Sequence, residues 1–230
     1  LKDGQSVTET FAVRVTDGTA TADANAVFTI TGSNDTPALT APSSITHTDT
    51  AINDTFANSD AAGATTLVAS DADASDTKTF AIFGQALNSS IAGFTHSKAG
   101  SYGTLYLNSG TGTYRYVPNR AAINAATTST SETFSLSVTD STETSSSQTL
   151  TVNINGVNDT PTLVPVASRG LLPAGTLYEG NSGLTATGRL VAAELDAGQT
   201  LTIAKDSVAA TLNGTSTSTG TTGATGVAAQ

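Results

Sequence analysis

The chain has 230 residues, a formal net charge of −10 at pH 7 and no cysteine. Because no basic patch is present to neutralise phosphates, nucleic acid is not expected as a partner, and the lack of cysteine excludes disulfides and cysteine–zinc sites. No apolar run approaches the roughly 18 residues of a membrane span, so we expect no membrane insertion.

The chain opens in a pattern of alternating apolar and polar residues, without the charged and apolar segments of a signal peptide. We therefore expect a fragment of a longer protein. Phe11, Val13 and Val15 share one face of the first segment, and residues 26–30 alternate in the same way. A period of two predicts half-buried β-strands at both places.

Later segments continue this pattern. Residues 100–119 predict a hairpin, with a glycine-bearing turn at 108–112 and with Tyr114 and Tyr116 on one strand face. Residues 119–127 come closest to a helical pattern and predict one short turn of helix. Thr, Val, Phe and Tyr fill the strands, while Gly, Asn, Asp and Ser separate them, so the predicted fold class is all-β.

A short phrase occurs twice, as GSNDTP in residues 32–37 and as GVNDTP in residues 156–161. Two longer blocks repeat in step with it. Phe11 corresponds to Phe134, and residues 67–80 correspond to residues 190–203, both at an offset of 123 positions (134 − 11 and 190 − 67). Matches that keep one register over this distance predict internal repeats of about 124 residues.

The repeats predict three segments. Residues 1–37 are the C-terminal strands of a first repeat, 38–161 form a complete repeat, and 162–230 are the N-terminal part of a third. The low-complexity tail of that third segment, residues 213–230, is expected to be poorly ordered. A repeat of this length with seven or more short strands suits an immunoglobulin-like, Greek-key β-sandwich, which is large enough to bury a core without disulfides.

Several motifs of the middle repeat resemble those of one known family. They are ASDADASDT in residues 69–77, the hairpin of residues 100–119, ETFSLSVTD in residues 132–140, and GVNDTP. In this order they resemble the VCBS repeat, a cadherin-like module of giant bacterial surface and secreted proteins. The resemblance implies tandem extender modules of a large adhesin, which is exported by a type I secretion system and serves attachment or biofilm formation.

The clearest candidate for metal binding is the acidic stretch with Asp71, Asp73 and Asp76. Closely spaced carboxylates repel one another unless a cation or water lies between them. Hard oxygen ligands without His or Cys suit Ca²⁺, although the spacing is not that of an EF-hand loop, which needs Glu where Ile82 stands. An ordinary acidic turn is the alternative, because Asp is common in β-turns.

Strand geometry predicts where Asp140 lies. It follows the strand of residues 134–138, and the last strand of the repeat then runs a sandwich's length away to the joint at residues 158–159. Asp140 is therefore expected at the opposite pole, near the joint at Asn34 and Asp35. The cadherin resemblance implies that Asp71 and Asp73 lie at this pole too, so we expect a calcium-bound joint there, with Pro37 stiffening its exit.

The second joint repeats this arrangement with changes. Its candidate ligands are Asn158, Asp159, Glu194 and Asp196, with Asp54 as a further contributor from the preceding repeat. Glu194 stands where the first joint has Asp71, Gln199 stands where it has Asp76, and the counterpart of Asp140 falls past residue 230. We therefore expect calcium to bind more weakly here than at the first joint, or not at all.

No motif points to catalysis, and we expect that the chain is not an enzyme. Neither a G-x-S-x-G elbow nor a P-loop occurs. His47 and His96 have no partner at ligand spacing and are expected at the surface. The four tyrosines between residues 102 and 116 are expected to divide between the core and a sheet face.

The sequence thus favours calcium-stiffened extender repeats of a secreted or cell-surface adhesin. Two alternatives stay open. One is a carbohydrate-binding module, against which the 5% aromatic content and the lack of Trp count, and the other is an accessory module of a secreted enzyme. Cell-surface glycans and neighbouring copies of the chain, joined head to tail, are further candidate partners.

Overall fold

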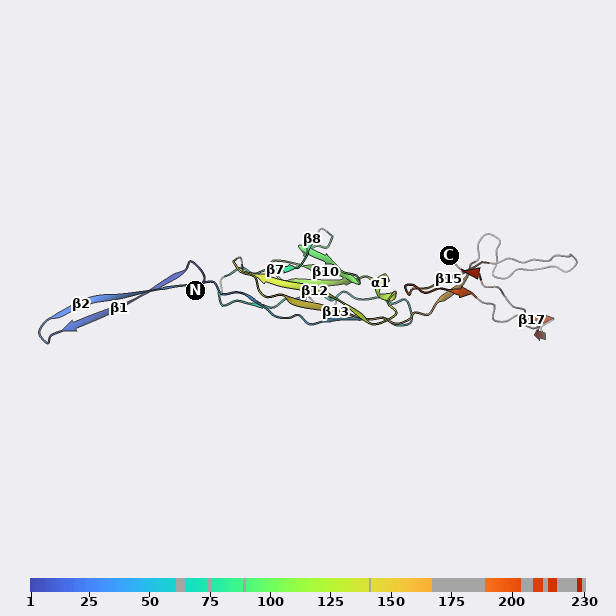
Figure 1. The fold of residues 1–230 in the computed structure, drawn as a ribbon, viewed down its shortest axis with the longest axis horizontal. Helices are drawn as coiled ribbons and strands as arrows, with labels where there is room; N and C mark the ends of the chain where they lie inside the picture. Colours follow the sequence, from blue (N-terminus) through green and yellow to red (C-terminus); the bar gives the residue numbers. More distant parts are fainter. Residues whose placement is uncertain are drawn as a thin grey trace. The chain divides into compact units, whose positions relative to one another are not determined.

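The computed structural model describes residues 1–60, 65–73, 76–88, 90–140, 142–166, 189–203, 209–212, 215–218 and 227–228. Strands dominate these residues, and the short helix α1 (Arg120–Asn124) lies where the sequence predicts one turn (Figure 1). The chain divides into two compact units. The first comprises Leu1–His47, Phe56–Ala122 and Ser131–Asn153, and the second comprises Thr48–Thr55, Ile123–Thr130 and Ile154–Gln230. Among the described residues, no helix has both the length and the apolar character needed to cross a membrane.

The first unit begins with a two-stranded hairpin. β1 (Ser6–Thr16) and β2 (Thr21–Thr31) pair antiparallel along their full length, from Ser6↔Thr31 to Thr16↔Thr21. The strands lie where the sequence predicts them, but they are exposed on both faces rather than half-buried. The reason is that their sheet contains no third strand within the described residues and nothing there covers it.

Two larger sheets follow. One has the strand order β5 (Thr65–Thr66), β11 (Thr113–Pro118), β10 (Gly103–Leu107), β9 (His96–Ala99) and β8 (Ala86–Leu87). The other has the order β4 (Ile45–Thr48), β13 (Gln148–Asn155), β12 (Thr130–Thr139) and β7 (Thr79–Ile82). A short separate pair joins β3 (Ala38–Leu39) to β6 (Ala69–Ser70).

Alternate side chains of these two sheets form the core. The rings of Tyr116 on β11 and Phe134 on β12 meet with centroids 6.1 Å apart. The aliphatic side chains that point inward with them are Leu105, Leu107, Leu136, Val138, Leu150 and Val152, all at most 1% exposed. Burying each such side chain contributes about 1.5–3 kcal/mol. The all-β sandwich predicted from the sequence is therefore the fold of this region.

The hairpin predicted for residues 100–119 is formed by β10 and β11. Gly112 turns the chain with a φ of 73°, a conformation that favours glycine. Gly103 lies against Tyr116, so that a Cβ there would be 2.3 Å from the ring. Tyr114 and Tyr116 are buried, while the other two tyrosines of this stretch are partly exposed, which is the predicted division.

The prediction that His47 lies at the surface is wrong. His47 is 8% exposed, and its ring stacks on that of Tyr116 with centroids 5.7 Å apart. Burial lowers the pKa of His47, and its Nε2 has no hydrogen-bond partner. Its position on β4 explains the error, since alternate residues of that strand point inward and His47 occupies one of them.

The second unit contains the remaining strands in three pairs. The pairs are β14 (Thr162–Val166) with β15 (Arg189–Ala193), β16 (Thr202–Ile203) with β19 (Val227–Ala228), and β17 (Ala209–Leu212) with β18 (Thr215–Ser218). Most of the tail at 213–230, for which poor order is predicted, lies outside the described residues.

Candidate functional site

The two copies of the repeated phrase have the same backbone setting. A Cβ on Gly32 would lie 2.5 Å from the carbonyl oxygen of Lys2, and a Cβ on Gly156 would lie 2.0 Å from that of Ala126. Both pairs are related by 124 positions (156 − 32 and 126 − 2). Each phrase therefore begins where the chain passes too close to another backbone segment for a side chain to fit.

The first acidic cluster lies in the first unit and consists of Asn34, Asp35, Asp71, Asp73, Asp76 and Asp140. The N–H of Asp35 donates to Oδ2 of Asp73 at 2.9 Å, and the amide of Asn34 donates to Oδ2 of Asp140 at 3.1 Å. The N–H of Asp73 in turn donates to Oδ1 of Asp71 at 2.9 Å. The joint, the acidic turn and the end of β12 thus meet in one place.

Asp140 is fully buried, yet its carboxylate is satisfied. Its Oδ1 accepts hydrogen bonds from the N–H groups of Glu143 at 2.7 Å and Thr142 at 2.8 Å, and its Oδ2 accepts one from the side-chain amide of Asn34. These bonds, that of Glu143 first, lower the pKa of Asp140. Asp35 has its side chain exposed to solvent.

A cationic group already lies against another carboxylate of the first cluster. Nζ of Lys2 is 2.9 Å from Oδ1 of Asp76. Two buried oxygens accept no hydrogen bond, namely Oδ2 of Asp71 and Oδ1 of Asp73. Lys2 therefore neutralises Asp76, while Asp71 and Asp73 each keep one partnerless oxygen.

The second acidic cluster lies in the second unit and consists of Asp49, Asp54, Asn158, Asp159, Glu194 and Asp196. The N–H of Asp159 donates to Oδ2 of Asp196 at 2.6 Å, as Asp35 does to Asp73 in the first cluster. The N–H of Asp196 donates to Oε1 of Glu194 at 3.1 Å, which repeats the bond between Asp73 and Asp71. The backbone plan is thus the same at both joints.

Gln199, in the position of Asp76, adds hydrogen bonds instead of a charge. Its Nε2 donates to Oδ1 of Asn158 at 2.5 Å and to Oδ2 of Asp196 at 3.1 Å. Asp54 is held in its own turn, where Oδ2 accepts the N–H and the hydroxyl of Thr50 at 2.6 and 2.7 Å.

Three carboxylates of the second cluster are buried without adequate partners. Asp49, Asp159 and Asp196 are 1%, 0% and 5% exposed. Oδ1 of Asp49, both oxygens of Asp159 and Oδ1 of Asp196 accept no hydrogen bond. Within the described part of the chain, none of these three residues forms an ion pair.

This crowding changes the acidity of Asp159. Burial first, and then the repulsion of Asp49, Asp196, Glu194 and Asp54, together raise the pKa of Asp159 to about 6. Burial also raises the pKa of Asp49. The second cluster therefore holds negative charge that its own hydrogen bonds do not balance.

Asp49 is the residue of this cluster that sequence reasoning misses. It follows β4, its N–H donates to the carbonyl oxygen of Asn155 at 3.0 Å, and its Oδ2 accepts the N–H of Val157 at 3.4 Å. In a Thr-rich stretch it looks like an ordinary turn residue. The available signal is its place at the end of a strand that pairs with the segment leading into the second joint.

The donor atoms fit a hard cation, although neither cluster is a finished metal site. As the side chains stand, no three His, Cys, Asp or Glu side chains among the described residues are arranged to hold a metal ion. The partnerless carboxylate oxygens could act together with amide and backbone carbonyl oxygens. Ca²⁺ takes six to eight oxygen ligands of such mixed kinds in flexible geometry, whereas zinc prefers N and S ligands.

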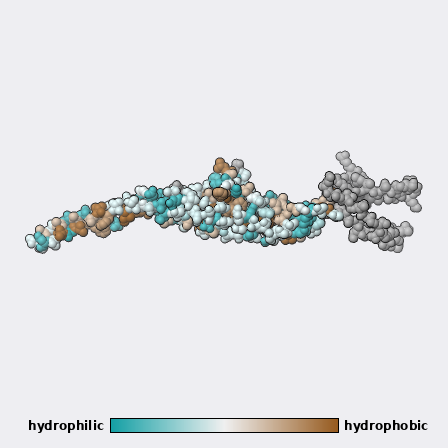
Figure 2. Space-filling view, in the orientation of Figure 1, coloured by the Kyte–Doolittle hydropathy of each residue, from teal (hydrophilic) through white to brown (hydrophobic). Residues whose placement is uncertain are grey.

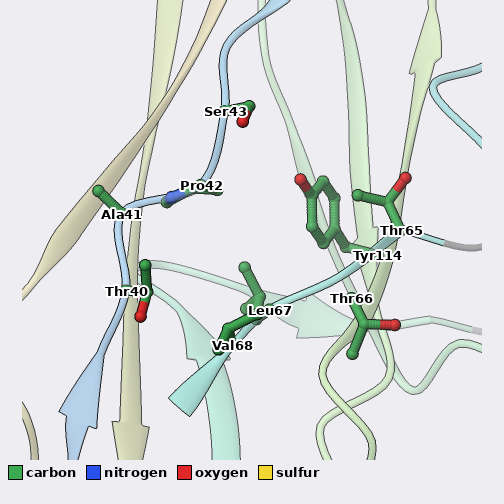
Figure 3. Close-up of a pocket in the computed structure, with 9 residues that line it drawn as sticks. All are labelled: Thr40, Ala41, Pro42, Ser43, Thr65, Thr66, Leu67, Val68 and Tyr114. Carbon is green, nitrogen blue, oxygen red and sulfur yellow. The ribbon is translucent and has the colours of Figure 1, made fainter.

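One cavity of about 300 Å³ is lined by no residue of either cluster. Figure 3 shows Tyr114 on one side of the cavity and Pro42 and Ser43 on the other. Leu67 lies between Tyr114 and Thr40. Its lining contains no carboxylate, histidine or basic side chain. Tyr114 is only 4% exposed, so it offers no ring face on which a sugar could stack.

Two packed β-sheets are a feature of cadherin-like domains. The family of bacterial cadherin-like domains matches residues 34–156, a range that includes the whole first cluster. The chain belongs to this family.

Among solved structures, the chain is similar to protocadherin gamma B2 extracellular cadherin domains 1–5. The identity is 11% and the TM-score 0.35, over 93% of this chain and 38% of that one, so the chain spans well under half the length of that structure. No curated protein matches the chain.

Proposed function

We propose that the chain is a run of extracellular spacer modules of a large bacterial adhesin, stiffened at its joints by Ca²⁺. Membership of the bacterial cadherin-like family supports an adhesion-type extracellular repeat. Residues 38–161 form the complete module of this proposal, with partial modules at 1–37 and 162–230. In such repeat proteins each module contacts its neighbours alone, so that length and rigidity are themselves the function, and we propose no catalytic role.

The observation that carries the calcium proposal is the set of partnerless, buried carboxylate oxygens on Asp49, Asp159 and Asp196. Burying an unpaired carboxylate costs several kcal/mol, and a bound cation removes most of that cost. In the second cluster the ion would be held by Asp49, Asp54, Asn158, Asp159, Glu194 and Asp196. Bound calcium supplies positive charge at the joint, while the protein residues fix the path of the chain through it.

We propose that the second cluster is the stronger of the two sites. The sequence predicts a weak second site because the ligands it considers are Asn158, Asp159, Glu194 and Asp196, together with Asp54. The structure adds Asp49. The first cluster would use Asn34, Asp35, Asp71, Asp73, Asp76 and Asp140, but Lys2 already pairs with Asp76 and backbone amides occupy Asp140.

Thermal unfolding with and without a calcium chelator tests this function. Free Ca²⁺ at about ten times its Kd stabilises each occupied site by about 1.4 kcal/mol, so the melting temperature should rise by several degrees. Asp159→Asn should remove most of the rise. Asp17→Asn removes the same charge from an exposed turn, and this variant should show the same rise in melting temperature as the wild type. An identical melting temperature with calcium and with chelator contradicts the proposal.

A further inference from the structure

The helix α1 supplies no ligand to the proposed calcium sites, yet it ends in a buried polar side chain. The surface around this helix mixes hydrophilic and hydrophobic residues (Figure 2). Asn124, the last residue of α1, is only 2% exposed. A buried amide is costly unless it is hydrogen-bonded, so the partners of Asn124 show what this residue holds in place.

Asn124 holds the loop that carries Asp54. Its Oδ1 accepts the N–H of Asp54 at 2.8 Å, and its Nδ2 donates to the carbonyl oxygen of Asp54 at 3.2 Å. Nδ2 also donates to Oδ1 of Asn53 at 3.4 Å. One side chain thus bonds both backbone groups of a residue 70 positions away in the sequence, much as a neighbouring strand would.

The carboxylate of Asp54 is thereby fixed at the second cluster. The bonds to Asn124 restrain its backbone, and the two bonds from Thr50 to Oδ2 restrain its side chain. Burial is the main cause of the raised pKa of Asp49 and of Asp159, and the charge of Asp54 contributes to both, so Asp54 lies near both carboxylates. The loop therefore holds Asp54 beside two buried carboxylates that repel it.

The turn that follows α1 contacts the other two segments of the second cluster. The carbonyl oxygen of Ala125 accepts the N–H of Ala197, the residue after Asp196, at 3.1 Å. The carbonyl oxygen of Ala126 lies so close to Gly156, where the linker phrase begins, that a Cβ there would be 2.0 Å away. Three consecutive residues at the end of α1 therefore meet all three segments that carry the proposed ligands.

We propose that Asn124 is a positioning residue for calcium at the second cluster, where it holds Asp54 and its loop in place beside the linker. This inference rests on the proposed calcium function and gives Asn124 no contact with the ion. Side chains that orient metal ligands from outside typically contribute about ten- to a hundredfold to metal affinity. We therefore expect Asn124→Ala to weaken Ca²⁺ binding at the second cluster about tenfold.

Isothermal titration of the whole chain with Ca²⁺ measures this effect. Asn88→Ala is the matched control, because Nδ2 of Asn88 likewise holds a loop, through the carbonyl oxygens of Ile91 and Phe94, and Asn88 belongs to neither cluster. Both variants should melt lower than the wild type in chelator, since each loses hydrogen bonds of a partly buried side chain. Only Asn124→Ala should lose calcium affinity.

The outcomes separate this inference from the function on which it rests. Equal calcium affinity in Asn124→Ala and the wild type overturns the inference alone, and so does an equal loss in Asn88→Ala and Asn124→Ala. A wild-type chain that binds no calcium overturns the proposed function as well.

A double-mutant cycle shows whether Asn124 acts through Asp54. If it does, the combination of Asn124→Ala with Asp54→Asn should bind calcium no more weakly than Asp54→Asn alone. Losses that multiply would mean that Asn124 stabilises the fold without positioning Asp54, and they would contradict the inference.

Hydrogen exchange of the wild-type chain in chelator gives a readout that needs neither calcium nor a variant. The N–H of Asp54 should exchange at least about tenfold more slowly than in an unstructured peptide of the same sequence, because Asn124 accepts it. Exchange at the rate of the peptide would show that Asn124 does not hold this loop, and it would overturn the inference even if Asn124→Ala failed to fold.

Discussion

The first and second acidic clusters share a backbone plan and differ in how their carboxylates are satisfied. Asp35 is exposed, whereas its counterpart Asp159 is completely buried. Hydrogen bonds from backbone amides lower the pKa of Asp140 in the first cluster, whereas burial and repulsion raise that of Asp159 in the second. The same linker phrase therefore leads to two different electrostatic environments.

Within residues 1–230, different side chains meet the two linker phrases. Residues before the first joint contribute Lys2, a cation, which pairs with Asp76. At the second linker phrase, Asp49 and Asp54 from the segment Thr48–Thr55 add acidic side chains. The linker alone does not make a cation site, and the residues brought to it decide how much charge is left over.

The largest contrast is expected from neutralising equivalent linker aspartates. In chelator, Asp159→Asn should stabilise the second unit, because it removes a buried charge from among four other carboxylates. We expect about 1 kcal/mol, less than the full pKa shift implies, since water screens charges at a joint. Asp35→Asn should change the stability by less than about 0.5 kcal/mol. Urea unfolding in chelator measures both, and a destabilised Asp159→Asn variant would contradict this view.

Asp49 should matter more for calcium than Asp76 does. Asp49→Asn removes a buried ligand with a partnerless oxygen, and we expect the calcium affinity of the second cluster to fall about tenfold, or about 1.4 kcal/mol. Asp76→Asn removes a carboxylate that Lys2 already neutralises, and the affinity should change less than threefold. Isothermal titration with Ca²⁺ measures both, and equal losses would mean that the two clusters do not differ as described.

The two clusters should respond to pH with opposite signs. The pKa of Asp159 is about 6 in the folded chain against an ordinary 3.8, so its contribution to stability is fully present below pH 3.8 and is lost as the pH rises through about 6. The pKa of Asp140 is lowered, so its contribution is present above its ordinary value and is lost as the pH falls below that value.

Melting curves in chelator between pH 7 and pH 4 measure these effects against the wild-type chain. Asp159→Asn should melt higher than the wild type at pH 7, and the difference should disappear as the pH falls through about 6 toward 4. Asp140→Asn should melt lower than the wild type at pH 7, and that difference should shrink only at the acid end. If both variants melt above the wild type at pH 7, or both melt below it, the opposite pKa shifts of Asp159 and Asp140 are contradicted.

The smallest effect is expected from Lys2. Its ammonium occupies Asp76, so Lys2→Ala should free that carboxylate and tighten calcium binding at the first cluster by two- to threefold at low salt. Lys98→Ala removes the same charge from β9 and is the control. Calcium titration at low and high ionic strength would measure the gain, and a loss of affinity in Lys2→Ala would contradict the competition.

Local pattern and internal repetition predict much of this fold. The period of two locates β1 and β2, and the glycine-bearing turn locates the β10–β11 hairpin. Strand length predicts that Asp140 lies near Asn34, and the cadherin resemblance implies that Asp73 lies near Asp35; both pairs are hydrogen-bonded in the structure.

Burial is the part that local pattern does not supply. The strands β1 and β2 have a half-buried pattern and are exposed, because burial depends on a second sheet. His47 lies in a polar-looking stretch and is buried against Tyr116, because its strand belongs to the sandwich. Asp49 reaches the second cluster through the pairing of β4 with β13, which joins residues about 100 positions apart.

Anomalous diffraction from crystals grown with Ca²⁺, or soaked with Tb³⁺ in its place, tests the central claim most directly. We predict a strong peak about 2.3–2.6 Å from carboxylate oxygens of Asp49, Asp159 and Asp196, and a weaker peak or none beside Asp71 and Asp73. A peak confined to the first cluster, or carboxylates of the second cluster satisfied by water or a lysine without any ion, would contradict the account.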